Sequence, residues 1–411
     1  MLEVAEALQR VLAETRAKSP RTVPLSDALG MVLAEDAVSD VDSPPHDKAL
    51  MDGYAVLAAD AHTGPVELRV LEQVAAGATP AQTVVPGAAT RIMTGAPIPD
   101  GADAVVMVEQ TEPLGVENAN SAADVPVRVR INASRVDSGQ NIMRRAASMR
   151  RGEVVLNSGR LLRPMEIGLL AEVGRAEVRV VPRADVAVLS TGDELVPADS
   201  LPGGGQIRNS NGPMLRAMVE RAGGRAVDLG IGRDEEAELR RLVALGLQHD
   251  VLVLSGGVSA GVLDLVPRVL ASEGVEQVFH KVHLKPGKPL WFGIRRRQPH
   301  DTLVFGLPGN PVSSLVCFEL FVRPAIAALA GERNDAPVQT ATLAAAHRQR
   351  GDRPTYWPAR RSSDVRSVSV TPLNWKGSAD LRTLADADCL IYFPPGEREY
   401  AVGDEVEIRS L

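Results

Sequence analysis

The stretch DVLVLSGG at residues 250–257 joins a short apolar run to a glycine turn, and two other stretches repeat this plan. Residues 185–192 read DVAVLSTG, and residues 303–309 read LVFGLPG. Helices are expected after these runs, over residues 214–222, 265–273 and 312–330. Strands that alternate with helices in this way predict a parallel sheet with crossover connections.

The turns after the three runs supply candidate ligand loops. Glycine lets the backbone approach a ligand closely, and exposed N–H groups in such loops bind anions. In open α/β sheets, ligands bind beyond the carboxyl ends of the strands. One such loop could be only a tight turn, but three in one region favour a ligand site. The residues concerned are Ser190, Thr191, Gly192, Asp193 and Glu194; Ser255, Gly256, Gly257 and Ser259; and Pro308, Gly309, Asn310 and Pro311.

The third loop also predicts a helix start. Asn310 is a good N-cap residue and Pro311 a good first helical residue, which would place the positive end of a helix beside the ligand.

Lys285 and Lys288 bracket a Pro-Gly turn between two apolar segments. Two cations held by a rigid turn suit an oxyanion or a phosphate. The turn is not a Walker loop, because the G-x-x-x-x-G-K-[ST] pattern is absent. The alternative is a solvated basic turn.

Acidic residues gather near the same loops, at Glu194, Asp234, Glu235 and Asp264. Carboxylates close to a phosphate site commonly hold magnesium or orient a charged ligand. Each could instead be a helix cap or a solvated charge, and Asp264 directly precedes a predicted helix.

Residues 23–181 predict a β-rich region, with short apolar runs at 66–71, 104–108 and 127–131 separated by turn residues, and a loop at 117–124. Two strings there, MDGYAV at 51–56 and RIMTGAP at 91–97, place Asp52 and Thr94 on turns. On physical grounds alone these could be ordinary hairpin turns. A polar linker at 332–337 leads into a third zone with strands at 389–393 and 405–408.

Composition limits the classes of function. A chain of 411 residues suggests two to four domains. A net charge of −7 and 3% aromatic residues argue against a nucleic-acid partner. Cys317 and Cys389 lie in apolar stretches typical of buried thiols, and no Cys/His spacing indicates zinc. The chain opens with a predicted helix over 2–17 and contains no signal peptide or uninterrupted membrane-length apolar run, so we expect a cytoplasmic protein with no membrane partner.

Six strings, in order, resemble the motifs of the molybdopterin molybdenumtransferase family, which includes the carboxy-terminal part of gephyrin. They span residues 51–56, 91–110, 190–194, 256–259, 285–289 and 306–314, and Lys376-Gly377-Ser378 near the end also fits. The resemblance implies a multidomain α/β plus β protein, with an elongated protomer in a homodimer. It implies four domains: a parallel-sheet α/β molybdopterin-binding domain (1–22 and 175–331), an elongated β domain (23–43 and 139–174), a β-rich lobe facing the partner protomer (44–138) and a C-terminal β-barrel-like domain (332–411).

The implied reaction uses Mg²⁺ and transfers molybdenum from molybdate to adenylated molybdopterin, which yields molybdenum cofactor and AMP. By the same resemblance, the glycine loops would bind the pterin and phosphates, and Asp234 and Asp264 would hold the metal. Catalytic roles would fall to Asp52, Thr94, Glu194, Lys285 and Lys288. Implied partners are the adenylyltransferase of the same pathway and apo-molybdoenzymes. The molybdate ligands would be Lys285, Lys288, Ser313, Arg353 and Ser378.

The sequence departs from the family pattern at residues 139–148, which read GQNIMRRAAS where the family reads Gly-Gln-Asn-Ile-Arg-x-x-Gly-Glu-Asp. Ala147 and Ser148 replace both acids. His46 and Leu265 replace aromatic residues that are common in the family. These departures keep open a second hypothesis, a non-catalytic relative that delivers pterin or cofactor to a partner protein. A generic nucleotide-binding enzyme would leave the β-rich region unexplained.

Overall fold

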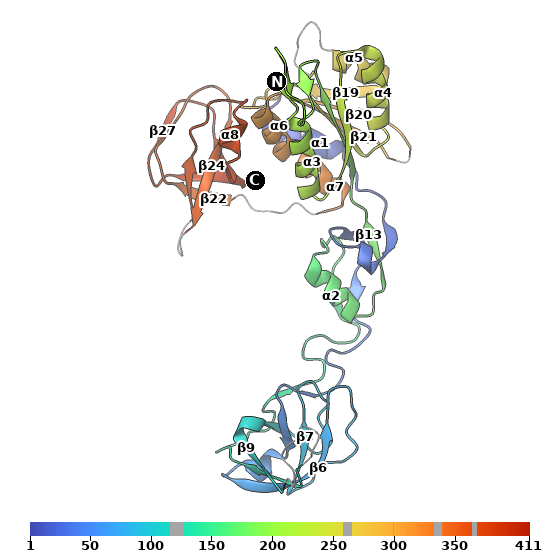
Figure 1. The fold of residues 1–411 in the computed structure, drawn as a ribbon, viewed down its shortest axis with the longest axis vertical. Helices are drawn as coiled ribbons and strands as arrows, with labels where there is room; N and C mark the ends of the chain where they lie inside the picture. Colours follow the sequence, from blue (N-terminus) through green and yellow to red (C-terminus); the bar gives the residue numbers. More distant parts are fainter. Residues whose placement is uncertain (116–125, 258–264, 299, 333–338, 364–367) are drawn as a thin grey trace. The chain divides into compact units, whose positions relative to one another are not determined.

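The computed structural model describes residues 1–115, 126–257, 265–298, 300–332, 339–363 and 368–411 (Figure 1). These residues form two compact units. The first comprises Met1–Glu35, Ser158–Pro164 and Glu177–Leu411, and the second Asp36–Asn157 and Met165–Ala176. The predicted loop at 117–124 and most of the predicted linker at 332–337 lie outside the described residues. The finer division into four domains stays a prediction.

A six-stranded sheet, in the order β17-β14-β18-β21-β20-β19, forms the centre of the first unit. The strands β17, β14, β18 and β21 run parallel, as predicted. The strands β20 and β19 were not predicted; β20 pairs antiparallel with both β21 and β19, and a loop over residues 281–290, not a crossover helix, joins β19 to β20. The bounds are Arg225–Gly232 (β17), Asp185–Thr191 (β14), Val251–Ser255 (β18), Thr302–Leu307 (β21), Trp291–Arg295 (β20) and Val275–His280 (β19).

Helices cover both faces of this sheet (Figure 1). Successive residues of β14 point to opposite faces, so Val186 and Val188 join one core and Ala187 and Leu189 the other. The first core contains α1 (Val4–Glu14), α3 (Asn211–Arg221) and the helical run from Pro311 to Leu329. The second contains α4 (Glu236–Gly246) and α5 (Leu265–Ser272).

The helical run consists of α6 (Pro311–Cys317), a π-helical turn η4 (Phe318–Val322) and α7 (Arg323–Leu329). Among the described residues it is the one helix long and apolar enough to cross a membrane, and 83% of its most apolar window is buried inside the protein. Its apolar composition is therefore explained by packing against the sheet. Its buried Glu319 pairs with Arg221 and Arg323.

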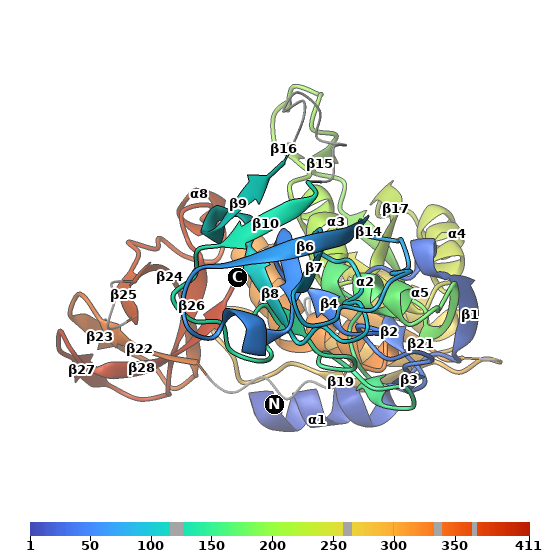
Figure 2. The same ribbon diagram turned by 90° about the horizontal axis from the view of Figure 1, so that it is seen from below.

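The C-terminal part of the first unit is a closed barrel in the order β22-β25-β24-β26-β28, seen beside the α/β sheet in Figure 2. It has its own core around Phe393, while Tyr356 and Leu390 pack into the α/β core. The barrel strands are Gln339–Leu343 (β22), Val368–Pro372 (β25), Thr355–Ser363 (β24), Cys389–Phe393 (β26) and Glu405–Ser410 (β28). The smaller elements of the unit are β1 (Arg21–Pro24), η1 (Leu25–Asp27), β2 (Val32–Leu33), β13 (Glu177–Val181), β15 (Leu195–Val196), β16 (Ile207–Arg208), β23 (His347–Gln349), α8 (Leu381–Leu384) and β27 (Arg398–Tyr400).

The second unit contains a six-stranded sheet in the order β8-β5-β7-β6-β10-β9. The strand β5 lies between β7 and β8, and a Cβ at Gly53 would lie 1.9 Å from the carbonyl oxygen of Val106, so only glycine fits there. The sheet strands are Ala104–Met107 (β8), Gly53–Val56 (β5), Ala88–Ile92 (β7), Val66–Val74 (β6), Arg128–Ile131 (β10) and Thr111–Leu114 (β9). The other elements are β3 (Ala37–Val38), β4 (Lys48–Ala49), η2 (Ala58–Ala61), η3 (Val108–Gln110), β11 (Ile142–Met143), β12 (Val154–Leu156) and α2 (Pro164–Glu172).

Candidate functional site

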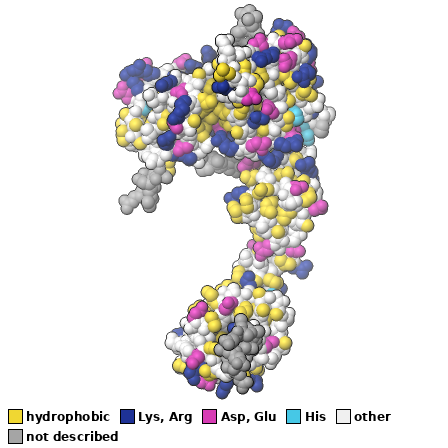
Figure 3. Space-filling model, in the orientation of Figure 1, with side chains coloured by type: hydrophobic (Ala, Val, Ile, Leu, Met, Phe, Trp, Pro, Cys, Tyr) yellow, Lys and Arg dark blue, Asp and Glu magenta, His cyan; other side chains and the backbone are white. Residues whose placement is uncertain are grey.

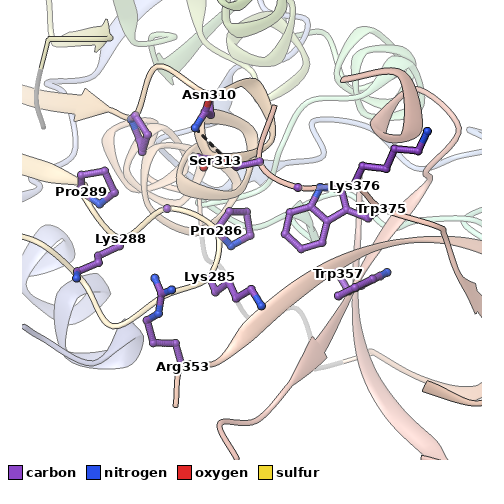
Figure 4. A pocket seen from close by; sticks show the side chains of 14 residues that line it. Lys285, Pro286, Lys288, Pro289, Asn310, Ser313, Arg353, Trp357, Trp375 and Lys376 are labelled. Carbon is purple, nitrogen blue, oxygen red and sulfur yellow. Dashed lines mark hydrogen bonds between the residues drawn. The ribbon is translucent and has the colours of Figure 1, made fainter. Parts of the chain in front are cut away.

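A cavity of about 510 Å³ lies in the first unit, between the turn after β19 and the barrel (Figure 4). The five residues predicted to bind molybdate, which are far apart in sequence, all line it. The predicted turn Lys285–Pro289 forms one part of the wall, and residues of the barrel and its loops form another. The lining residues are Lys285, Pro286, Gly287, Lys288, Pro289, Pro308, Asn310, Ser313, Arg353, Trp357, Trp375, Lys376, Gly377 and Ser378.

Backbone hydrogen bonds fix the lysine turn to the barrel. The N–H of Lys285 donates to the carbonyl of Pro354 (2.9 Å), and its carbonyl accepts from the N–H of Tyr356 (2.9 Å). The Arg353 guanidinium donates to the carbonyl of Leu284 (3.0 Å), which holds this cation against the turn. The peptide bond between Lys285 and Pro286 is cis.

Gly287 allows the turn to pack tightly on the long helical run. Its φ is +120°, and a Cβ there would lie 2.7 Å from the Cys317 sulfur and 2.8 Å from a Leu284 methyl carbon. Burial raises the pKa of the Cys317 thiol, so this cysteine acts as a packed apolar group. Both cysteines are free and buried, as the sequence predicted.

The opposite attachment of the barrel runs through Ser378. Its hydroxyl accepts from the Asn310 side-chain amide (3.0 Å), and its carbonyl accepts from the N–H of Val312 (3.0 Å). Asn310 occupies the predicted N-cap position with Pro311 directly after it, but its side chain makes no capping bond. The amide is used to hold the pocket wall instead.

The pocket is locally basic in an acidic protein. Lys285, Lys288, Arg353 and Lys376 line it, and none of its lining residues within the described part of the chain is acidic. On the visible face of the first unit, lysines and arginines are otherwise interspersed with acids (Figure 3). Four cations and two hydroxyl groups around one cavity can bind an oxyanion.

The three predicted glycine loops meet at the carboxyl edge of β14, β18 and β21. A Cβ at Gly256 would lie 2.5 Å from the carbonyl oxygen of Thr191, so two of the loops touch. The side chain of Asn211 joins the second loop to the third, donating to the Ser255 hydroxyl (2.8 Å) and to the Gly309 carbonyl (2.7 Å). Ser259 lies outside the described residues.

Sequence reasoning missed Asn211. The Ser-Asn-Gly string that starts the helix α3 was the available signal, since such residues are favoured at helix starts. It also did not weigh the tryptophans Trp357 and Trp375.

The predicted metal residues are only partly described. Asp193 and Glu194 are exposed, and Asp193 accepts from the backbone N–H of Asp234 (3.1 Å). Asp264 lies outside the described residues. Among those described, no group of three or more His, Cys, Asp or Glu side chains could hold a metal ion. The described residues therefore do not form a magnesium site by themselves.

Asp52 and Thr94 lie together in the second unit, on the turns before β5 and after β7. The Asp52 carboxylate accepts from the backbone N–H of Thr94 (2.6 Å) and from its hydroxyl (2.7 Å). These bonds, the backbone one first, hold the pKa of Asp52 below its usual value. Both residues are exposed, so the pair is an ionised acceptor on the surface of its unit.

Comparison with known proteins covers the whole chain. Residues 2–174 match the MoeA N-terminal region (domain I and II), residues 187–328 a probable molybdopterin binding domain, and residues 340–411 the MoeA C-terminal region (domain IV). The molybdopterin molybdenumtransferase 2 of Mycobacterium tuberculosis is 36% identical over 421 residues, which cover 98% of each protein. The chain belongs to the molybdopterin molybdenumtransferase family.

Other members of the molybdopterin molybdenumtransferase family are also similar to this chain over nearly its whole length. The molybdopterin molybdenumtransferase of Staphylococcus aureus (strain Mu50) is 32% identical, covering 99% of this chain and 95% of that protein. A crystal structure of the molybdopterin biosynthesis moeA protein from Pyrococcus horikoshii OT3 superposes with a TM-score of 0.80 at 29% identity, over all of both chains.

The departure from the molybdopterin molybdenumtransferase pattern forms an exposed turn in the second unit. Ala147 and Ser148 are exposed, and the N–H of Ser148 donates to the carbonyl of Ser43 (2.9 Å). Ala146 stands where the family has glycine, and its φ is +58°, in the left-handed region that favours glycine. The turn therefore keeps a glycine conformation without the glycine. Asp47 holds it by accepting from the Arg144 guanidinium (2.7 Å) and the Arg145 backbone N–H (2.8 Å).

Proposed function

We propose that this protein is a molybdopterin molybdenumtransferase, which inserts molybdenum from molybdate into adenylated molybdopterin and releases AMP. The observation that carries the proposal is the convergence of Lys285, Lys288 and Arg353 with Ser313 and Ser378 on one pocket without a lining carboxylate. A tetrahedral dianion fits this donor set, since ammonium, guanidinium and hydroxyl groups all donate hydrogen bonds and none repels it.

Within this proposal, the cations hold molybdate where the two dithiolene sulfurs bind molybdenum and displace one oxo ligand, which leaves as water with the two thiol protons. Lys285 is half-buried and Arg353 is anchored on the Leu284 carbonyl, so both are restrained before the substrate arrives. Positioning the two reactants in one cavity removes much of the entropic cost of their meeting.

The loops around Thr191, Gly256 and Gly309 are the proposed site of the phosphates. Their backbones approach closely, and the pocket opens beside the third loop through Pro308 and Asn310. The phosphoanhydride would lie next to the molybdate site, where attack of water on phosphorus releases AMP. The other residues proposed to contact the phosphates and the pterin are Gly192, Asp193, Ser255, Gly257, Ser259 and Pro311.

Asp52, Thr94 and Glu194 are proposed to polarise the attacking water or the oxo groups. The carboxylate of Asp52 stays ionised through its bonds to Thr94, as a general base requires. In the homodimer expected of the family, this pair would serve the loops of the other protomer.

Magnesium is part of the same proposal, with Asp234 and Asp264 as its candidate ligands. It would neutralise phosphate charge. The described residues do not form a magnesium site, and none of the proposed steps is assigned to magnesium. We further propose cytoplasmic localisation, and the pathway's adenylyltransferase and apo-molybdoenzymes as partners.

The test is an assay of AMP release by the purified protein, supplied with adenylated molybdopterin, magnesium and molybdate. Release should require molybdate and should fall by a factor of at least about 10² in a Lys285→Ala/Lys288→Ala double variant, because removing one oxyanion donor alone costs about 10²–10³ in rate. The matched control is Arg240→Ala/Arg268→Ala, which removes two exposed cations that pair with Glu236.

Two outcomes would contradict the proposal. Release of AMP that continues without molybdate would indicate a simple hydrolase. Tight binding of the adenylated pterin without any turnover would indicate a cofactor carrier and would direct attention to Ala147 and Ser148.

A further inference from the structure

Two of the three tryptophans of the chain line the basic pocket. Trp357 belongs to barrel strand β24, and Trp375 belongs to the loop after β25. Figure 4 shows the two indoles on one side of the pocket, Lys288 and Pro289 on the other, and Lys285 and Pro286 between them. The face of an indole repels an anion, so molybdate does not account for two indole faces in this pocket. Their presence in an oxyanion pocket therefore calls for a second ligand group.

The two indoles form a braced wall. Their ring centroids are 5.0 Å apart with the planes at 87°, and behind Trp357 the ring of His347 lies at 4.6 Å and stacks on Phe393 at 4.1 Å. The Trp357 Nε1 donates to the carbonyl of Leu373 (2.8 Å), which fixes the orientation of that ring. Both tryptophans are half-buried, so part of each ring stays accessible. A fixed, partly exposed aromatic wall is suited to stacking a planar heterocycle.

The side chain of Trp375 also favours a ligand that can accept a hydrogen bond. Its Nε1 is buried and has no acceptor in the described part of the chain. A buried donor without an acceptor is unfavourable, and a heterocycle with ring nitrogens or a carbonyl oxygen would supply one.

The size of the pocket leaves room for such a ring. Pockets for drug-sized ligands enclose roughly 300–1,000 Å³. At about 510 Å³ the cavity is far larger than a tetrahedral oxyanion needs. The extra space lies beside an aromatic wall.

The pocket offers a separate contact for each group of the substrate. In adenylated molybdopterin the dithiolene lies between the pterin rings and the phosphate. In the pocket Lys285 lies between the tryptophans and Lys288 (Figure 4), and the third glycine loop reaches the cavity at Pro308 and Asn310. If the phosphates bind the loops and the sulfurs meet molybdate at the cations, the tryptophans of the barrel remain as the contact for the pterin rings.

We propose that Trp357 and Trp375 bind the pterin ring system of the substrate, which stacks on one indole and meets the other at its edge, because the two indole planes are perpendicular. The inference rests on the proposed function and names the part of the site that recognises the ring. The barrel then supplies the ring-binding wall, and the α/β domain the phosphate-binding loops.

The kinetic test compares Trp357→Ala and Trp375→Ala with the parent protein in the AMP-release assay. Loss of one stacking partner should raise KM for the adenylated pterin about five- to one-hundred-fold. KM for molybdate should stay unchanged, because the cations remain. Trp375→Phe should restore most of the affinity, since it keeps an aromatic face; a variant that had merely lost its fold would not distinguish the two substrates.

A binding test needs no turnover. The third tryptophan, Trp291, is 2% exposed in the α/β core and donates to Gln277 (2.9 Å). In a Trp291→Phe background all tryptophan emission comes from the pocket, so 6-carboxypterin should quench it, and Trp291→Phe alone should keep full activity. Quenching in a protein that releases no AMP would support the ring site while the proposed function fails.

The inference is overturned if both alanine variants keep the parent KM for the adenylated pterin in an active enzyme. It is equally overturned if KM rises alike for both substrates, since that result would mean a general collapse of the pocket. Absence of quenching by 6-carboxypterin at concentrations that inhibit AMP release would exclude the tryptophans as its site.

Discussion

The basic pocket of the first unit and the Asp52–Thr94 pair of the second unit carry chemistry in opposite ways. The pocket gathers four cations from distant parts of the chain, and no carboxylate of the described residues lines it. The pair is one exposed carboxylate whose neighbour already donates to it twice. The pocket offers donors on several sides of a cavity, whereas the pair is exposed on the surface of its unit. In the proposed mechanism, binding and activation of the reactants therefore belong to separate sites of this chain.

The strongest test of this separation is Asp52→Asn. If the carboxylate activates water, AMP release should fall about 10²-fold or more, as is typical when a general base is lost. Binding of molybdate, measured by calorimetry, should not change, because the pocket lies in the other unit.

The matched control for Asp52→Asn is Asp60→Asn. Asp60 is another carboxylate of the second unit that accepts a backbone N–H, from Gly87 at 2.8 Å. Undiminished turnover in Asp52→Asn would show that this carboxylate does not activate water.

Gly287→Ala tests the pocket side, with Gly396→Ala as its control. Both glycines have φ +120°, but only at Gly287 would the new Cβ meet other atoms, at 2.7 Å from Cys317. The two variants share the backbone cost, and Gly287→Ala should lose about 1–3 kcal/mol more in free energy of unfolding from the clash. Urea unfolding measures the difference, and molybdate affinity should fall only in Gly287→Ala. Equal losses in both variants would show that the turn tolerates the extra atom.

The smallest expected effect is a shift in pH dependence caused by Thr94→Val. The Asp52 carboxylate has a pKa in the folded protein below its unfolded value, so its ionised form stabilises the folded state. This stabilisation is present above the unfolded pKa and is lost as pH falls through the folded pKa. Valine removes the hydroxyl bond but keeps the backbone bond. The pKa of Asp52 should rise partway, so the acid limb of the rate profile should move to higher pH.

Thr94→Ser keeps the hydroxyl and should leave the profile in place. A shift in both variants would attribute the change to the methyl group of Thr94.

Sequence patterns predicted those parts of the molecule that depend on local signals. Apolar runs followed by glycine turns located β14, β18 and β21, because buried parallel strands need no alternation. The antiparallel strands β19 and β20 were not predicted, since strand direction depends on pairing across the sheet. Lys285 and Lys288 were predicted from their Pro-Gly turn, but the other molybdate ligands were named only through family resemblance. No spacing rule could have brought Arg353 to the Leu284 carbonyl.

Two residues show what pattern reasoning omits. Asn211 lies before the helix predicted over residues 214–222 and was not considered, although its amide joins two loops across the sheet edge. Trp375 lies in a stretch of low periodicity, and its role depends on a neighbour, Trp357, that is 18 positions away in the sequence. Both roles are long-range contacts, which a single sequence does not encode locally.

The barrel is attached to the α/β domain on both sides of the pocket, through Lys285 and through Ser378. An anion held by both Lys285 and Ser378, as proposed for molybdate, would contact both attachments. Ligand occupancy and barrel docking are therefore thermodynamically linked: bound ligand should stabilise the docked arrangement by RT ln(1 + [L]/Kd), and a weakened barrel should in turn weaken the ligand.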